Sequence, residues 1–124
     1  MLKLTFTASA IYVALVGLGL MFFPLWFGVG AVPADATPEL VALLRLLGGP
    51  FLGIAALNWL SRNSDRSLLK PVLLANLIGF GAVAANDLIG IATGQSRDLA
   101  KIFVVIHLVF ALLFGLAARD RGRD

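Results

Sequence analysis

The sequence predicts an all-α fold, a bundle of four transmembrane helices with up-down-up-down topology and both termini in the cytoplasm. Composition is the first reason, because 60% of the 124 residues are hydrophobic and only 14% are charged, against roughly 25% charged in soluble domains. A soluble chain of this length buries only about two-thirds of its surface, so it could not hide this much apolar side chain. We therefore expect one integral membrane domain, residues 1–124.

The first apolar run covers residues 4–27. A helix rises about 1.5 Å per residue, so roughly 20 residues cross a hydrocarbon layer of about 30 Å. The run is far longer than the roughly 7–15 apolar residues of a signal peptide, and we expect a retained membrane span. Pro24 lies near its outer end, where proline ends or bends a helix.

The second run covers residues 40–60 and contains the strongest local irregularity, Gly48-Gly49-Pro50. Proline removes a backbone donor and clashes with the preceding turn, which predicts a kink at this point. Broken membrane helices can expose backbone groups to a substrate. Close packing around the kink is the commoner alternative.

The third and fourth runs cover residues 72–92 and 102–118. All four runs are joined by short polar connectors, and connectors of this length make consecutive helices antiparallel neighbours. The connectors are residues 28–39, 61–71 and 93–101.

The basic residues predict the orientation. Arg97 and Lys101 fall on one side of the predicted bundle, and a larger set falls on the other: Lys3, Arg62, Arg66, Lys70, Arg119, Arg121 and Arg123. Cytoplasmic loops carry the excess of Lys and Arg, so the larger set marks the cytoplasmic side.

Three ionisable residues interrupt the apolar runs at matching depths. Arg45, Asp87 and His107 each lie five residues inside the outer end of their predicted span, about 7–8 Å along the helix axis. Charged groups inside a bilayer are costly and usually pair with one another. We therefore expect one cluster of these three side chains, with the neighbouring Asn86 taking part.

Two interpretations of the cluster stay open. In the structural one, Arg45 and Asp87 neutralise each other, and Asn86 and His107 complete their hydrogen bonds. In the functional one, Arg45 orients an anionic or carbonyl group while Asp87 and His107 exchange protons. A polar route from this cluster to the cytoplasm would have only Asn76 and Asn58 along it.

Several chemistries are excluded by what the sequence lacks. Cysteine is absent and there is a single histidine, so there is no disulfide exchange, no thiolate metal site and no bis-histidine haem. We expect neither a bound metal nor a cofactor. The net charge of +3 comes from residues between apolar runs, which indicates contact with lipid headgroups rather than nucleic acid.

The segment from Pro38 to Gly49, with Arg45-x-x-Gly48-Gly49 opening the second span, resembles small bacterial four-span inner-membrane proteins of unknown function. Asn86-Asp87-x-x-Gly90 is similar to a polar patch in the same group. The layout is also loosely similar to the DoxX family, whose first-helix arginine is absent here. The resemblance implies a bacterial inner-membrane protein and brings no activity with it.

The first functional expectation is a structural or accessory subunit that interacts with other membrane subunits or with itself. The alternative is a small solute or proton-coupled transporter, or a ligand-binding membrane protein, that uses Arg45, Asp87 and His107. An enzyme or quinone-binding protein ranks third, because no catalytic set is present.

Overall fold

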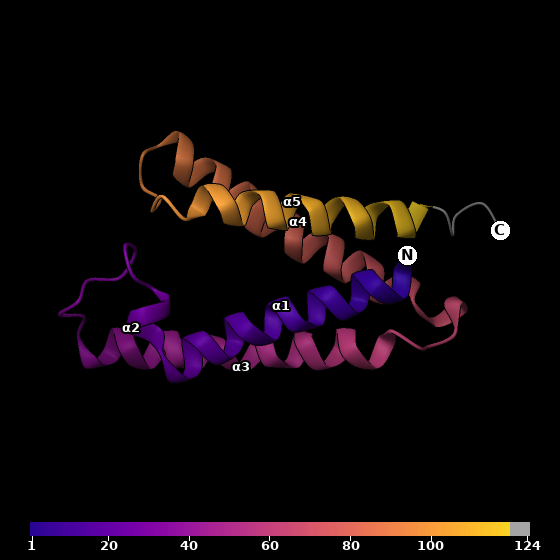
Figure 1. The fold of residues 1–124 in the computed structure, drawn as a ribbon, viewed down its shortest axis with the longest axis horizontal. Coiled ribbons are helices and arrows are strands. Elements are labelled where there is room, and N and C mark those ends of the chain that lie inside the picture. The colour runs from indigo at the N-terminus through magenta and orange to yellow at the C-terminus, as the bar shows by residue number, and fades with distance from the viewer. Residues whose placement is uncertain (120–124) are drawn as a thin grey trace. The chain divides into compact units, whose positions relative to one another are not determined.

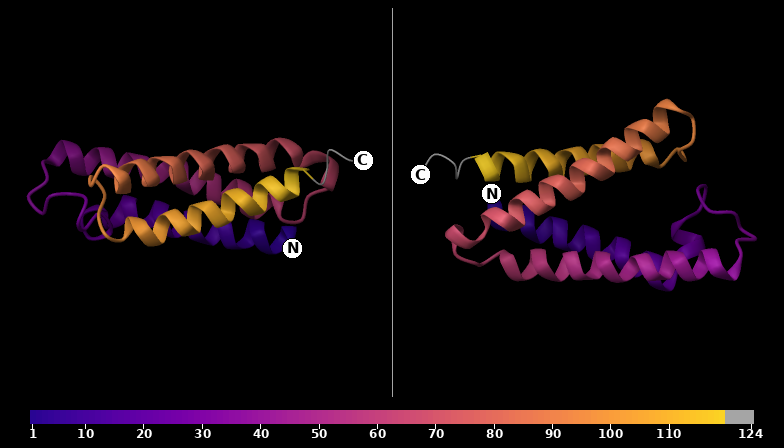
Figure 2. Two further views of the ribbon diagram at one scale, coloured as in Figure 1. Left: turned by 90° about the horizontal axis from the view of Figure 1, so that it is seen from above. Right: turned by 180° about the vertical axis from the view of Figure 1, so that it is seen from behind.

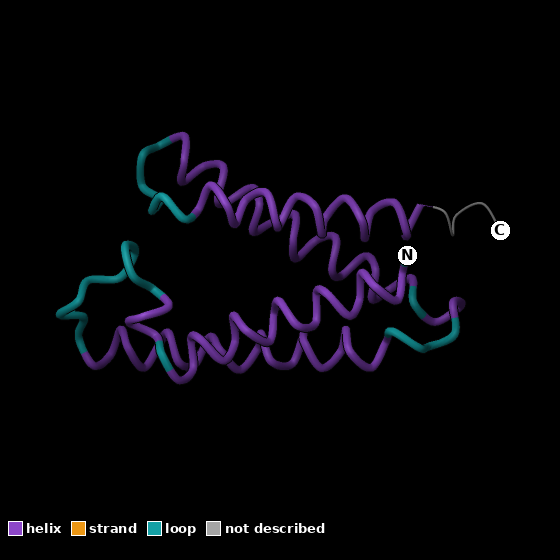
Figure 3. The backbone as a smooth tube through the Cα atoms, in the orientation of Figure 1, coloured by secondary structure: helices purple, strands orange, loops and turns teal. Residues whose placement is uncertain are grey.

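The computed structural model describes residues 1–119, and these residues are helical apart from their connecting loops (Figures 1 and 3). No strand occurs among them, which confirms the all-α class. The predicted basic residues Arg121 and Arg123 lie outside the described residues. The elements are α1 (Leu2–Phe22), α2 (Pro24–Phe27), α3 (Pro38–Ser61), the 3₁₀ turn η1 (Arg66–Leu68), α4 (Lys70–Ala92) and α5 (Ala100–Arg119).

The four long helices are each long and apolar enough to cross a membrane. Their lengths run from 20 residues in α5 to 24 in α3, close to the roughly 20 that a bilayer core requires. The chain is therefore a candidate multi-pass membrane protein with four spans, as the apolar runs predicted.

The first helix is shorter than its apolar run. It ends at Phe22, and Pro24 begins the separate short helix α2, which packs against α3. This break agrees with the expectation that Pro24 ends or bends the helix, because proline has no N–H to donate and disfavours a helical conformation at the residue before it. Phe23 accordingly has the non-helical angles φ −132° and ψ 49°.

The described chain forms two compact units. The N-terminal unit, residues 6–62, contains most of α1 together with α2 and α3; the C-terminal unit contains α4 and α5, with residues 1–5. Within the N-terminal unit α1 and α3 run side by side, and within the C-terminal unit α4 and α5 do the same (Figures 1 and 2). Each unit is thus built on a pair of long helices joined in sequence.

Glycine allows α1 and α3 to approach closely. A Cβ atom built on Gly48 would lie 2.6 Å from the carbonyl oxygen of Gly17, and one on Gly17 would lie 3.0 Å from the carbonyl oxygen of Gly48. No side chain fits between backbones at this distance. Small residues serve this purpose in membrane helices, where close van der Waals packing drives helix association.

A buried hydrogen bond joins the same two helices nearer the other end. Asn58 Nδ2 of α3 donates to Ser9 Oγ of α1 at 3.2 Å, and Ser9 Oγ donates to the Phe6 carbonyl at 3.1 Å. Both Ser9 and Asn58 are fully buried. The serine hydroxyl therefore acts as donor and acceptor at once, and the asparagine has a partner inside the apolar contact.

This bond should make a measurable contribution to the α1–α3 pair. In a double-mutant cycle of Ser9→Ala and Asn58→Ala, we expect a coupling free energy of about 0.6 kcal/mol, the average for side-chain hydrogen bonds between membrane helices. The cycle is read from unfolding of the detergent-solubilised protein by sodium dodecyl sulfate. Full additivity of the two substitutions would show that the bond adds nothing to stability.

Aromatic rings fill the contact between α4 and α5. Phe80 of α4 lies 4.8 Å from the Phe110 ring centroid and 5.9 Å from that of Phe114, all three side chains being buried. One turn away, a Cβ on Gly115 would lie 3.4 Å from Leu77 Cδ1, an ordinary contact. Large rings thus separate the two helices here, in contrast to the glycine contact of the N-terminal unit.

The turn after α4 needs a glycine. Gly94 has φ +68°, a left-handed conformation that other residues adopt only at a steric cost. The following amides of Gln95 and Ser96 donate back to the Gly90 carbonyl at 2.8 and 3.1 Å, which satisfies the end of the helix as a C-terminal glycine motif does. This reversal returns the chain toward α5 and sets the register between Asp87 and His107.

Candidate functional site

The C-terminal unit brings Asp87 of α4 and His107 of α5 into direct contact. His107 Nδ1 and Asp87 Oδ2 are 2.6 Å apart, and the two side chains are 11% and 16% exposed. The residues are 20 positions apart in sequence and meet because α4 and α5 are paired on either side of the turn at Gly94. Two titratable groups therefore share one largely buried hydrogen bond.

The chemistry of the two groups assigns the direction of this bond. An ionised carboxylate can only accept, so Nδ1–H of His107 donates to Asp87 Oδ2 when Asp87 is charged. Such a bond fixes the imidazole tautomer and places the proton-accepting lone pair of a neutral ring on Nε2. The pair can hold a proton between its two atoms, and protonation of His107 would convert it into an ion pair.

Aromatic rings lie next to the imidazole. The His107 centroid is 6.2 Å from that of Phe80 on α4 and 6.3 Å from that of Phe103 on α5. The guanidinium of Arg97, in the connector before α5, lies 5.3 Å from the Phe103 centroid. The two phenylalanine rings thus give the imidazole a largely apolar surrounding next to its hydrogen bond with Asp87.

The structure does not bring Asn86 into this pair. Asn86 is exposed, and among residues 1–119 the Asp87 carboxylate bonds to His107 and to no asparagine. Consecutive helical residues point about 100° apart, so adjacent positions cannot both face α5.

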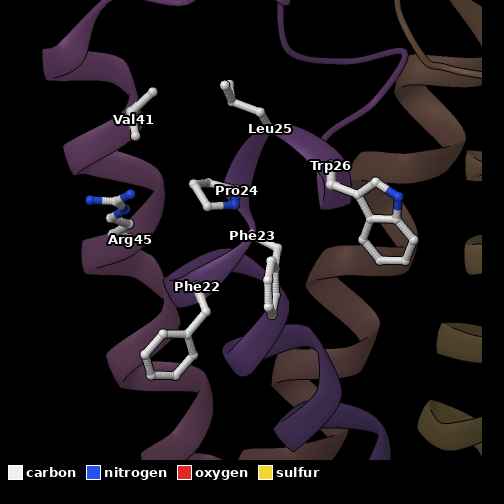
Figure 4. A pocket seen from close by; sticks show the side chains of 7 residues that line it. All are labelled: Phe22, Phe23, Pro24, Leu25, Trp26, Val41 and Arg45. Atoms are coloured by element: carbon white, nitrogen blue, oxygen red, sulfur yellow. The ribbon is translucent and has the colours of Figure 1, made fainter.

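Arg45 belongs to the N-terminal unit, on α3. Its predicted ion pair with Asp87 would join the two units and stays a prediction. Within its own unit Arg45 lies beside the break between α1 and α2, where it lines a pocket with residues 22–26 and Val41 (Figure 4). The sequence did not predict this pocket, because an expected break at Pro24 does not say that the residues after it pack against α3.

The segment Gly48-Gly49-Pro50 lies inside an uninterrupted helix. α3 begins after Thr37, whose Oγ1 accepts from Leu40 N at 3.3 Å, and continues through Pro50 to Ser61. Pro50 has no backbone N–H, so the Leu46 carbonyl lacks the helical hydrogen bond that residue 50 would otherwise donate. The two glycines have different surroundings, since Gly48 is buried against α1 while Gly49 has no neighbouring atom within 4 Å of a built Cβ.

Among residues 1–119 no group of three His, Asp or Glu side chains is arranged to hold a metal ion. The Asp87–His107 pair supplies two side-chain ligands, whereas protein zinc sites use three or four. The described site therefore contains hydrogen-bonding and proton-transfer groups, with no ligand set that points to a metal.

A scan against protein-family models, a search of curated proteins and a search of solved structures each found no match to this chain. The likeness to small four-span membrane proteins stays an expectation drawn from Arg45, Gly48-Gly49 and Asn86-Asp87. Function must therefore be inferred from the residues and their arrangement.

Proposed function

We propose that this chain is an accessory or interaction subunit of a membrane assembly in the bacterial inner membrane. In this proposal the two helix pairs join in one up-down-up-down bundle, with both termini in the cytoplasm. The excess of Lys and Arg on one side of the apolar runs supports this orientation. The short connectors support the topology and leave little of the chain outside the bilayer to do other work.

The observation that carries the proposal is a row of small residues on the face of α3 that the rest of the N-terminal unit leaves uncovered. A Cβ built on Gly49 or Gly53 meets no atom within 4 Å, and Ala42 and Ala56 on the same helical face are exposed. We call these four residues the open α3 face. Gly48 already provides the close contact inside the N-terminal unit. The open α3 face is therefore available to a further helix, and its glycines would let the backbone of that helix approach closely.

Native mass spectrometry tests the proposal on protein purified from its native membrane in a mild detergent. We expect the wild-type chain in a larger assembly, with copies of itself or with stoichiometric partner subunits. Gly49→Leu combined with Gly53→Leu should release it as a monomer, because two leucines would hold a partner helix away from the open α3 face. The double variant should keep its helical circular dichroism, since the built Cβ positions are unobstructed.

Gly81→Leu on α4 is the matched control. A Cβ on Gly81 also meets nothing within 4 Å, so this variant adds one leucine at another open position and should leave the assembly intact. An assembly that survives the double substitution would contradict a role for the open α3 face. A wild-type monomer would contradict the accessory function itself.

The Asp87–His107 hydrogen bond favours a second candidate function, proton-coupled transport or binding of a small solute. A carboxylate that orients an imidazole is a common arrangement for moving a proton near neutral pH. In the same mass spectrometry experiment, this candidate requires a monomer or small homo-oligomer that carries a defined small molecule.

A further inference from the structure

The N-terminal unit contains a pocket at the point where α1 gives way to α2. Its volume is about 230 Å³, and it is lined by residues 22–26 on one side and by Val41 and Arg45 of α3 on the other. Figure 4 shows Val41 and Arg45 across from Pro24 and Leu25. The pocket exists because Pro24 interrupts the helix and α2 packs against α3.

Arg45 is the one charged residue of this lining. Within the N-terminal unit its guanidinium has no carboxylate within ion-pair distance and no hydrogen bond. Arg45 lies seven residues after Pro38, the start of α3, which is about 10 Å along the helix axis. A permanently charged group is thus held beside four aromatic or proline side chains, Phe22, Phe23, Pro24 and Trp26.

A guanidinium at this depth in a membrane span needs an anion. Leaving it in hydrocarbon costs several kcal/mol, and long basic side chains therefore extend toward the headgroup region. Trp26 marks the same level, because tryptophan concentrates at membrane interfaces. Arginine binds phosphate through two parallel N–H···O bonds, and phospholipid headgroups supply phosphate at this level of the bilayer.

We propose that this pocket binds an anionic phospholipid, with the phosphate on Arg45 and the upper part of an acyl chain against Phe22 and Phe23. The single cation selects for a negatively charged headgroup, and the apolar lining selects for a lipid over free phosphate. The pocket lies within the N-terminal unit, and the proposal does not depend on the open α3 face.

The two tryptophans make the test specific. Trp26 lines the pocket, whereas Trp59 lies near the other end of α3 with the Arg62 guanidinium 3.7 Å above its ring. A Trp59→Phe protein therefore reports on the pocket alone. In liposomes, its fluorescence should be quenched more strongly by phosphatidylglycerol with brominated chains than by brominated phosphatidylcholine. Arg45→Gln should reduce this anionic preference roughly fivefold, the contribution of one basic side chain near an anionic surface.

Arg45→Lys serves as the second variant, and we expect it to keep part of the preference because the charge remains while the bidentate geometry is lost. The control is a Trp26→Phe protein, in which Trp59 reports from beside Arg62; here Arg45→Gln should leave the anionic preference unchanged. Equal quenching by both lipids in the Trp59→Phe protein would overturn the proposal, and so would a preference that survives Arg45→Gln. Displacement of the brominated lipid by inorganic phosphate would overturn the assignment to a lipid and identify free phosphate as the ligand.

Discussion

Gly48→Ala should lower the free energy of unfolding by about 1–3 kcal/mol, the usual cost of overpacking a close contact. The added Cβ would lie 2.6 Å from the Gly17 carbonyl oxygen and 3.0 Å from Met21 Cβ. The first of these is a backbone atom, which cannot rotate away as a side chain would. The helices α1 and α3 would have to separate, and unfolding by sodium dodecyl sulfate in mixed micelles measures the loss.

Gly49→Ala is the matched control, one position further along the same helix. A Cβ there meets no atom within 4 Å, and alanine is a better helix former than glycine by about 0.5–1 kcal/mol. We therefore expect an unchanged or slightly higher stability. Equal destabilisation by the two substitutions would contradict the close α1–α3 contact and point to a general sensitivity of the helix around Pro50.

Asp87→Ala should destabilise the protein by about 1–3 kcal/mol, because it leaves the Nδ1 donor of His107 without an acceptor in a largely buried position. Combined with His107→Ala in a double-mutant cycle, it should show a coupling of about 0.5–3 kcal/mol, as contacting residues do. Asp87→Asn retains an acceptor oxygen and should cost less. The same unfolding assay measures the stability of the wild type and of these four variants.

A second double-mutant cycle tests the other partner proposed for Asp87, which is Arg45. If Arg45 pairs with Asp87, then Arg45→Ala and Asp87→Ala will be coupled as well; full additivity would show that this ion pair does not form. His107→Gln discriminates between the interpretations of the cluster. A structural cluster tolerates the substitution, whereas loss of a cellular phenotype in a well-folded His107→Gln protein would indicate proton chemistry.

The helical class and the four candidate spans could be predicted because apolar composition and run length are properties of the chain itself. The break in the first helix could be predicted from Pro24, although the hydropathy of the run continues to Phe27. Hydropathy measures whether a segment prefers lipid, and it does not register a missing backbone donor. The pocket at Arg45 could not be predicted, because it also requires α2 to pack against α3, which is a tertiary contact.

The sequence by itself determined that Asp87 and His107 lie at matching depths, because helix rise converts position into distance. Only the tertiary structure decided that these two meet at 2.6 Å while the adjacent Asn86 stays exposed, since that depends on the rotation of α4 about its axis against α5. The same holds for Gly48 and Gly49, which are equivalent in composition and hydropathy. One is buried against α1 and the other is open, because packing selects a single face of a helix and neighbouring residues point about 100° apart.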